Sequence, residues 1–350
     1  MLSFFIKRIG YGLLIILGVV VVVFLLFFAL PGDPVSMIVG PRTDEITREA
    51  IKKDLGLDQP LPMQLYLYLR DLSPISLHAN TEEEQQKYDY NTILPIGQKV
   101  LVAKVPYLRR SYQTNRRVSE IMAEKVVLTI ILAVSAMIFA TIVGIFLGIV
   151  AALKQNTWWD HSIVTVSALG ISTPSFVAAT LVSLYFGYTL GPYLGLNAIG
   201  SLWEVGIYGR ELHLENLILP SLTLGIRPLA IIVQLTRSSM LEVLSQDYIR
   251  TAKAKGVSRY KVIFKHALKN TLNPVITAIS GWLASLLAGA YFVEIIFNYK
   301  GLGFETNLAV NNLDLPVIMG ATLVIAVVFV VINIAVDLLY AVIDPRVRLS

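Results

Sequence analysis

Six long apolar segments limit what this chain can fold into. At about 1.5 Å per residue, helices of these lengths match or exceed a hydrocarbon core of roughly 30 Å. Inside lipid, every backbone N–H and C=O must find a partner within the segment itself, which an isolated strand cannot provide. We therefore expect an all-α polytopic membrane protein with six transmembrane helices. The predicted spans are residues 9–30, 126–153, 162–190, 214–235, 275–297 and 317–343.

The rest of the sequence divides around these spans. Residues 1–31 are a predicted N-terminal transmembrane anchor, because no small-residue cleavage site follows the apolar run. Residues 32–125 are an insertion between the first two spans. Residues 126–344 hold the other five spans as one core, which a polar loop at 238–273 interrupts. Residues 345–350 form a short tail.

The sequence lacks the patterns of the common enzyme classes. Only 15% of its 350 residues are charged and none is cysteine, so neither a disulfide nor a thiolate metal site is expected. There is no G-x-x-x-x-G-K-[ST] loop for nucleotide phosphates and no G-x-S-x-G nucleophile elbow. The four histidines lie far apart, without the spacing of paired ligands. We predict no catalytic residue, no metal, no cofactor and no nucleic-acid partner.

Positive charge concentrates in the loop after the fourth span. Together with Arg237 just before it, this loop carries eight basic residues against two acidic ones. Short loops rich in Lys and Arg stay in the cytoplasm, so this loop is predicted to lie there. With six spans, both termini are then cytoplasmic as well. Residues 32–125 are expected outside, since long segments translocate largely regardless of charge.

The same loop has the pattern of two short helices. The first covers residues 247–255 and meets Gly256, the residue type favoured in a left-handed helix cap. The second covers residues 259–270 and is expected to end at Asn273-Pro274. A side chain at Gly256 is expected to strain the backbone and to obstruct the second helix. We call residues 247–270 the two-helix segment.

The two-helix segment carries a family resemblance. DYIRTAKAKG followed by an amphipathic helix resembles the cytoplasmic signature loop of permease subunits in bacterial ABC importers. That loop classically begins Glu-Ala-Ala, with Gly four residues after the second Ala, and the corresponding residues here are Arg250, Thr251, Ala252 and Gly256. The first two depart from the general motif, but Arg-Thr-Ala with the glycine is similar to the dipeptide, oligopeptide and nickel subfamily. Other segments similar to that subfamily follow its order: LPGDP at 30–34, LGLDQPLP at 55–62, ILPSLTLG at 218–225, YKGLG at 299–303 and DPR at 344–346.

The resemblance implies a type I ABC importer permease fold and a role in transport. The chain would form part of a pathway for di- or oligopeptides, with nickel complexes as the alternative substrate. The implied partners are a second permease subunit of related but different sequence, two ATPase subunits, an extracytoplasmic substrate-binding protein and the lipid of the bacterial plasma membrane. A membrane assembly scaffold is the alternative from another class, but a scaffold would not need the two-helix segment.

In such families the signature loop docks into a cleft on the ATPase subunit. An exposed basic loop can also hold topology or bind anionic lipid, and these are the alternatives to docking. The resemblance assigns docking to Asp247, Tyr248, Arg250, Thr251, Ala252, Lys255, Gly256 and Arg259.

Two charged residues within the spans are candidates for the translocation pathway. Arg227 lies near the middle of the fourth span, where a charge costs at least about 2.5 kcal/mol, so it should face protein or water. It either attracts an anionic group of the substrate or pairs with an acid on a neighbouring helix or subunit. Glu294, near the outer end of the fifth span, either seals the pathway or stabilises helix packing. The helix-breaking sequence ISTPS at 171–175 is of the kind that lines cavities.

The insertion has local order of its own. Its sequence predicts helices at 43–57 and 61–72. Residues 81–90 are acidic and poor in apolar side chains, so we expect them to lie on the surface or to be mobile. The insertion is either a vestibule that contacts a substrate-delivery protein or a cover for the outer helix ends.

Overall fold

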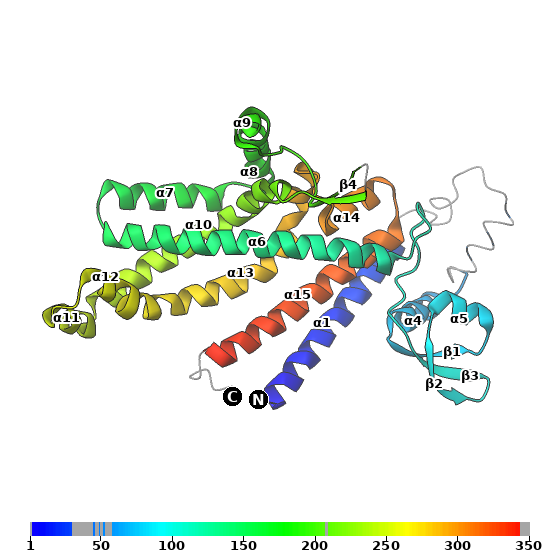
Figure 1. The fold of residues 1–350 in the computed structure, drawn as a ribbon. Helices are drawn as coiled ribbons and strands as arrows, with labels where there is room; N and C mark the ends of the chain where they lie inside the picture. Colours follow the sequence, from blue (N-terminus) through cyan, green and yellow to red (C-terminus); the bar gives the residue numbers. More distant parts are fainter. Residues whose placement is uncertain are drawn as a thin grey trace. The chain divides into compact units, whose positions relative to one another are not determined.

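The computed structural model places most of the chain in helices (Figure 1). It describes residues 2–29, 45, 49, 52, 58–206 and 209–343. These residues form two compact units. The core unit comprises residues 125–305 and 331–343, and the N-terminal unit comprises residues 2–124 and 306–330.

Three predictions fall on other parts of the chain. The LPGDP motif at 30–34 and the tail at 345–350 lie outside the described residues. So does most of the helix predicted at 43–57. These predictions stay as they are.

Four helices in the described part of the chain are long and apolar enough to cross a membrane. They contain the first, second, fourth and sixth predicted spans almost completely, because an apolar run of more than twenty residues has few alternatives to a helix. Two further pairs of helices qualify if each bent pair forms one span. The four long helices are α1 (Leu2–Ala29), α6 (Val118–Leu153), α10 (Glu215–Ser245) and α15 (Leu315–Ile343).

The third predicted span is divided. α7 (Trp158–Ser172) and α8 (Ser175–Val182) are bent by 112°, and α8 runs on into a π-helix, η1 (Ser183–Thr189). The bend lies at Thr173-Pro174, where Thr173 has an extended backbone with ψ 126°. Proline disfavours the helical conformation of the residue before it, so the break follows from the local sequence. The helix-breaking role predicted for ISTPS is confirmed, and the third predicted span, 162–190, consists of a bent pair of helices rather than one straight helix.

The second helix of the two-helix segment does not end where the sequence predicts. It begins as α12 (Arg259–Lys261), continues as a π-helix, η2 (Val262–Ala267), and joins α13 (Leu268–Ile296) without a break at Pro274. The predicted end at Asn273-Pro274 is therefore wrong. Apolar helices tolerate an internal proline because neighbouring groups and local π adjustments satisfy the freed backbone positions. The bend in this run, 54°, lies instead between Leu287 and Ala290.

Helix α10 holds the core unit together. It contacts α7, α8 and α13, and its side chains Ile232 and Met240 are completely buried. Figure 1 shows α11 and α12 at one end of this unit and the hairpin and the start of α14 at the other. The shorter elements at that second end are α9 (Gly191–Leu194), β4 (Trp203–Gly206), β5 (Gly209–Leu212) and α14 (Leu302–Asn311).

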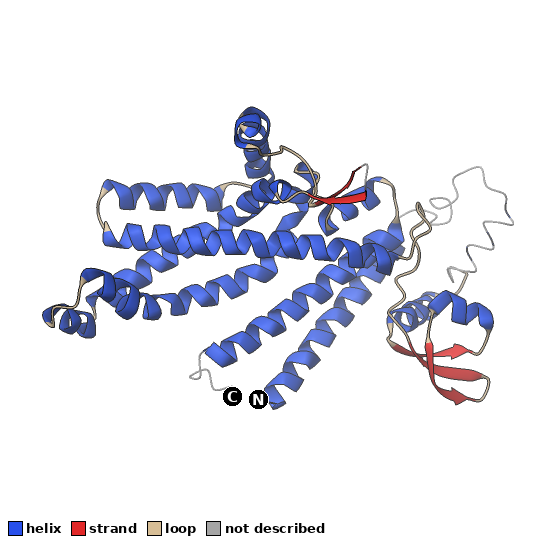
Figure 2. Cartoon of the chain, viewed as in Figure 1, coloured by secondary structure: helices blue, strands red, loops and turns tan. Residues whose placement is uncertain are grey.

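The N-terminal unit contains a small sheet that the sequence does not predict. Three antiparallel strands pair in the order β1-β3-β2 (Figure 2), with Leu77 opposite Leu101 and Leu94 opposite Leu101. The expectation of an all-α chain is therefore wrong for this region. Outside lipid, strands can pair with one another, so the argument that excludes them from the spans does not apply here. The strands are β1 (Ile75–Ala79), β2 (Asn91–Ile96) and β3 (Lys99–Ala103).

The acidic stretch 81–90 contains a helix and is mostly exposed, so the expected surface position is confirmed except for its two tyrosines. α5 (Glu82–Tyr88) begins at Thr81, whose hydroxyl accepts a hydrogen bond from the Glu84 amide at 3.4 Å. The two tyrosines of the stretch, Tyr88 and Tyr90, are buried against Val100 and Val102 of the sheet. The two tyrosines bury enough area to hold this polar stretch against the sheet. The low number of apolar residues in the stretch did not indicate this packing.

Polar contacts fix the sheet region to its neighbours. The helix α4 (Leu61–Leu72), which confirms the prediction at 61–72, carries a buried Asp71 that accepts a hydrogen bond from the Tyr88 hydroxyl at 2.9 Å. Near the start of α15, Asp314 accepts hydrogen bonds from the Ser111 hydroxyl at 2.5 Å and the Tyr112 amide at 3.1 Å. These contacts join α4 to α5 within the insertion and join the insertion to the residue before α15.

A buried histidine makes the stability of this unit depend on pH. His78 contacts Ser76 and Glu84 at 2.9 and 3.0 Å, and Tyr88, Tyr90 and the cations Arg70 and Lys104 also face it. Burial lowers the pKa of His78 below its ordinary value of 6.5, and this exceeds the opposing effect of Glu84. The unfolded chain therefore binds a proton that the folded chain does not.

Stability of the N-terminal unit should be complete above about pH 6.5 and should fall as the pH is lowered through the range beneath it. Hydrogen–deuterium exchange of residues 75–103, corrected for intrinsic rates, should therefore speed up between pH 7.5 and 5.5. His78→Gln keeps a polar side chain without titrating and should remove this dependence. An equal dependence in both proteins would contradict the assignment to His78.

Candidate functional site

The two-helix segment is built at one end of the core unit. α10 ends at Ser245, and α11 (Asp247–Ala254) begins two residues later after Gln246, which has an extended backbone with ψ 149°. A single residue thus separates a long apolar helix from a short polar one. The predicted first helix at 247–255 is confirmed to within one residue.

Gly256 makes the corner between the two helices. Its φ is +75°, in the left-handed region predicted for it, and its amide donates to the Lys253 carbonyl at 3.0 Å. An added Cβ would meet nothing within 4 Å. The expectation that a side chain here obstructs the second helix is therefore wrong, because the space is open. What remains is the backbone cost of a left-handed residue with a side chain, about 1 to 2 kcal/mol.

Apolar side chains fix the underside of the segment. Ile249 of α11 is completely buried, as is Ala267 of η2. Both belong to one cluster with the ends of α6 and α10, so the segment packs on two long helices rather than extending freely into solvent. The buried members of this cluster are Ile149, Ala152, Met240, Val243, Ile249, Val262, Ile263 and Ala267.

The outer surface of the segment carries the residues predicted to dock. All of them are exposed except Ala252, which is half-buried. Tyr248 is held by a hydrogen bond that its hydroxyl accepts from Asn270 at 2.8 Å, so the two helices are also joined on this side. Apart from Ala252, which packs against the inner cluster, the predicted docking set therefore lies on the outside of a corner whose inside is packed.

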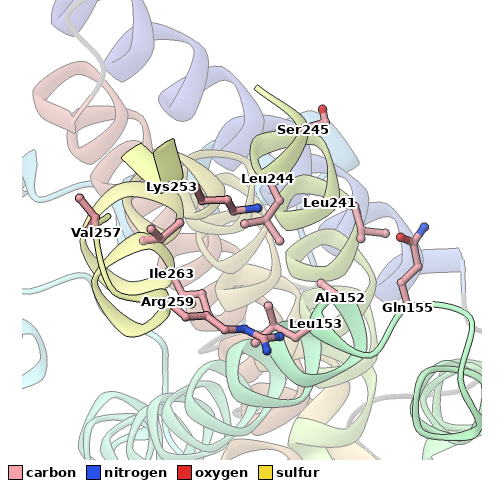
Figure 3. Close-up of a pocket in the computed structure, with 11 residues that line it drawn as sticks. Ala152, Leu153, Gln155, Leu241, Leu244, Ser245, Lys253, Val257, Arg259 and Ile263 are labelled. Atoms are coloured by element: carbon pink, nitrogen blue, oxygen red, sulfur yellow. The ribbon is translucent and has the colours of Figure 1, made fainter. Parts of the chain in front are cut away.

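A pocket of about 600 Å³ lies beside this corner. Its floor is apolar, and the cationic side chains of Lys253 and Arg259 come to it from the two helices (Figure 3). Such a pocket can accept an apolar side chain with an acidic or polar end. The residues that line it are Ala152, Leu153, Gln155, Leu241, Leu244, Ser245, Lys253, Val257, Arg259, Val262 and Ile263.

An ion pair that the sequence reasoning missed fixes the helices next to the segment. Asp160 at the start of α7 is buried, and both its oxygens accept hydrogen bonds from Arg237 of α10, at 2.5 and 2.7 Å. The Asn156 amide donates a third at 3.0 Å. Two-point pairing of this kind is orientation-specific. In the sequence, Arg237 is one of the eight basic residues that follow the fourth span. Nothing near it in the sequence marks Asp160 as its partner.

The two pathway candidates lie in different surroundings. Arg227 is exposed, and its guanidinium donates to the Thr173 carbonyl at the α7–α8 bend, at 3.3 Å. Glu294 is completely buried, and its carboxylate accepts hydrogen bonds from the Thr129 hydroxyl and the amides of Gly303 and Phe304. Neither lies at the two-helix segment, and their roles in a pathway stay predictions.

Comparison with known families identifies the chain. The model of the family described as "Binding-protein-dependent transport system inner membrane component" matches residues 144–349, and the model of that family's N-terminal part matches residues 1–133. The chain belongs to this family. It is a permease subunit of an ABC transport system, and the two-helix segment falls inside the longer match.

Curated relatives of this permease match along its whole length. The dipeptide transport system permease protein DppB of Escherichia coli (strain K12) is 35% identical, with 99% of each chain covered. DppB of Alkalihalophilus pseudofirmus is also 35% identical, over 99% of this chain and 100% of the relative. A putative peptide permease protein of Brucella suis biovar 1 is 34% identical over the full length of both chains.

Solved structures show that the permease has a known fold. Two inward-facing crystal forms of the MetNI methionine ABC transporter each give a TM-score of 0.51. They cover 64% and 65% of this chain and 97% of the solved chain, at 16% and 15% sequence identity. Identity at that level supports the fold alone.

Proposed function

We propose that this permease belongs to an ATP-driven importer of di- or oligopeptides and that its two-helix segment receives the force of ATP hydrolysis. The observation that carries the proposal is the corner at Gly256, with an exposed polar outside and an inside packed on α6 and α10. A segment that only held topology would need charge but not a rigid corner. The names of the full-length relatives support peptides as the substrate class.

ATP hydrolysis itself belongs to partner subunits in this proposal. The chain has no phosphate-binding loop of its own, so hydrolysis requires two ATPase subunits, one of which docks at the two-helix segment. The pocket beside Lys253 and Arg259 suits an acidic or polar side chain of such a subunit. A second permease subunit completes the pathway, and an extracytoplasmic binding protein supplies the peptide.

The proposed topology has six spans in the bacterial plasma membrane, with each bent pair of helices counted as one span. Both termini and the loop at 238–273 are cytoplasmic, and residues 32–125 are extracytoplasmic. The concentration of basic residues after α10 supports this orientation.

Gly256→Val should uncouple transport from ATP hydrolysis. The substitution costs about 1 to 2 kcal/mol of backbone strain, which turns the second helix away from its position or destabilises the corner. In proteoliposomes with the complete importer, substrate-stimulated ATP hydrolysis and peptide uptake should fall together. Gly256→Asn is the matched control, because asparagine tolerates the left-handed region, and it should retain most of the activity. Normal stimulation in Gly256→Val, at normal assembly, would contradict the docking role.

Cysteine labelling should show which side of the membrane each loop faces. The chain has no native cysteine, so Gln85→Cys and Ser258→Cys can be compared without background. Both positions are exposed or half-buried within their units. In intact cells an impermeant maleimide should label position 85 and not position 258, and permeabilised cells should show both. The reverse pattern would invert the topology and remove the ATPase from the two-helix segment.

Arg227→Gln should impair transport selectively. If the guanidinium meets the terminal carboxylate of a peptide in a partly dry pathway, the pair contributes about 1.5 to 3 kcal/mol. Uptake of a peptide with a free C-terminus should then fall more than uptake of its amidated analogue. Equal losses for both peptides would assign Arg227 to structure, consistent with its contact to the Thr173 carbonyl at 3.3 Å.

A further inference from the structure

The YKGLG motif at 299–303 surrounds a buried carboxylate at the end of the core unit opposite the two-helix segment. The Glu294 carboxylate accepts hydrogen bonds from the Thr129 hydroxyl at 2.6 Å and from the Gly303 and Phe304 amides at 2.6 and 3.1 Å. Thr129 belongs to α6, Glu294 to α13, and the two amides to the first turn of α14. One side chain thus joins three helices.

Neighbouring contacts repeat the same connection. Thr129 also accepts a hydrogen bond from the Leu302 amide at 2.8 Å, and Tyr299 donates from its hydroxyl to the Leu128 carbonyl at 3.1 Å. Lys125 of α6 pairs with Glu305 of α14 at 3.1 Å. Since both oxygens of Glu294 are occupied and the side chain is completely buried, no surface is left on it for a substrate.

The motif requires glycine at position 301 because the backbone passes against this cluster. An added Cβ on Gly301 would lie 2.6 Å from the Thr129 hydroxyl oxygen and would overlap the Glu294 carboxylate. Real Cβ atoms do not approach this closely, so the turn after α13 closes on α6 only with glycine there.

The other end of the same helix is the two-helix segment. A helical run extends from Arg259, which lines the pocket, to Leu287, and a 54° bend separates it from the short piece Ala290–Ile296 that carries Glu294. The sequence at the bend includes Gly289, a residue type at which helices bend readily. One part of the helix therefore begins at the proposed ATPase surface, and the other part is fixed by Glu294.

We propose that Glu294 is a positioning residue for coupling: it latches the short end of α13 to α6 and α14, so that movement entering at the two-helix segment is converted into a change of angle at the bend. The proposal rests on the proposed function, because the movement comes from the ATPase subunits. Without the latch, the whole helix follows the two-helix segment. ATP hydrolysis then no longer depends on the state of the helix end that carries Glu294.

The test replaces the hydrogen bonds of Glu294 with a disulfide bond that can be formed by oxidation and broken by reduction. Glu294→Ala removes the latch and leaves space, and Thr129→Cys with Gly301→Cys places two thiols where the Cβ of residue 301 lies 2.6 Å from the side-chain oxygen of residue 129. The Glu294→Ala change also removes the carboxylate that a side chain at position 301 would overlap, so the second cysteine has room beside residue 129. No native cysteine competes. ATP hydrolysis by the complete importer is measured with and without peptide-loaded binding protein.

Glu294→Ala should assemble in normal amount but lose the acceleration of hydrolysis by substrate. The triple variant should show the same loss when reduced and should regain substrate dependence when oxidised, which a merely structural role does not predict. Glu294→Ala with Thr129→Cys alone is the matched control, and oxidation should not change it. Full substrate dependence in Glu294→Ala, or no recovery in the oxidised triple variant, would overturn the latch.

The unmodified importer distinguishes this failure from failure of the proposed function. If it shows no substrate-stimulated hydrolysis, the proposed function is overturned and the latch with it. If it is stimulated normally while the variants behave like it, the latch alone is overturned. Should Glu294→Ala fail to assemble, the triple variant purified under oxidising conditions supplies the decisive comparison before and after reduction.

Discussion

The proposed ATPase surface depends on the apolar contact between the two-helix segment and the ends of α6 and α10. Ile249 and Ala267 are buried on this contact, and burying an aliphatic side chain contributes about 1.5 to 3 kcal/mol. That contact fixes the direction in which the exposed residues point. It also packs the segment against two helices that extend through the core unit, as the proposed coupling requires.

Local sequence predicted the parts of this arrangement that local chemistry determines. The long helices follow from apolar length, the corner follows from Gly256 at the end of a polar helix, and the bend at Thr173-Pro174 follows from the restriction that proline imposes. The fate of Pro274 could not be predicted in this way. Whether a proline ends a helix or is accommodated in it depends on neighbouring packing, and the sequence does not show that packing.

The long-range polar contacts and the small sheet could not be predicted from the local sequence for a related reason. Asp160 and Arg237 are 77 residues apart, and Thr129 and Glu294 are 165 apart, so no local pattern marks them as partners. The sheet of the N-terminal unit depends on Tyr88 and Tyr90 covering strands that are short and only partly apolar. The YKGLG motif is visible in the sequence. Its requirement for Gly301 follows only from the packing of this turn against Thr129 of α6.

The claim that the two-helix segment receives an ATPase is open to a direct physical measurement. Lys255 is exposed next to the corner, so a photo-crosslinking amino acid at this position reports what covers it in native membranes. The same group at the half-buried Lys87 of α5 serves as the comparison. After irradiation, mass spectrometry of the position-255 adduct should identify a nucleotide-hydrolysing subunit that is missing from the position-87 adduct. An adduct at position 255 with lipid alone, in an importer that transports normally, would contradict the account.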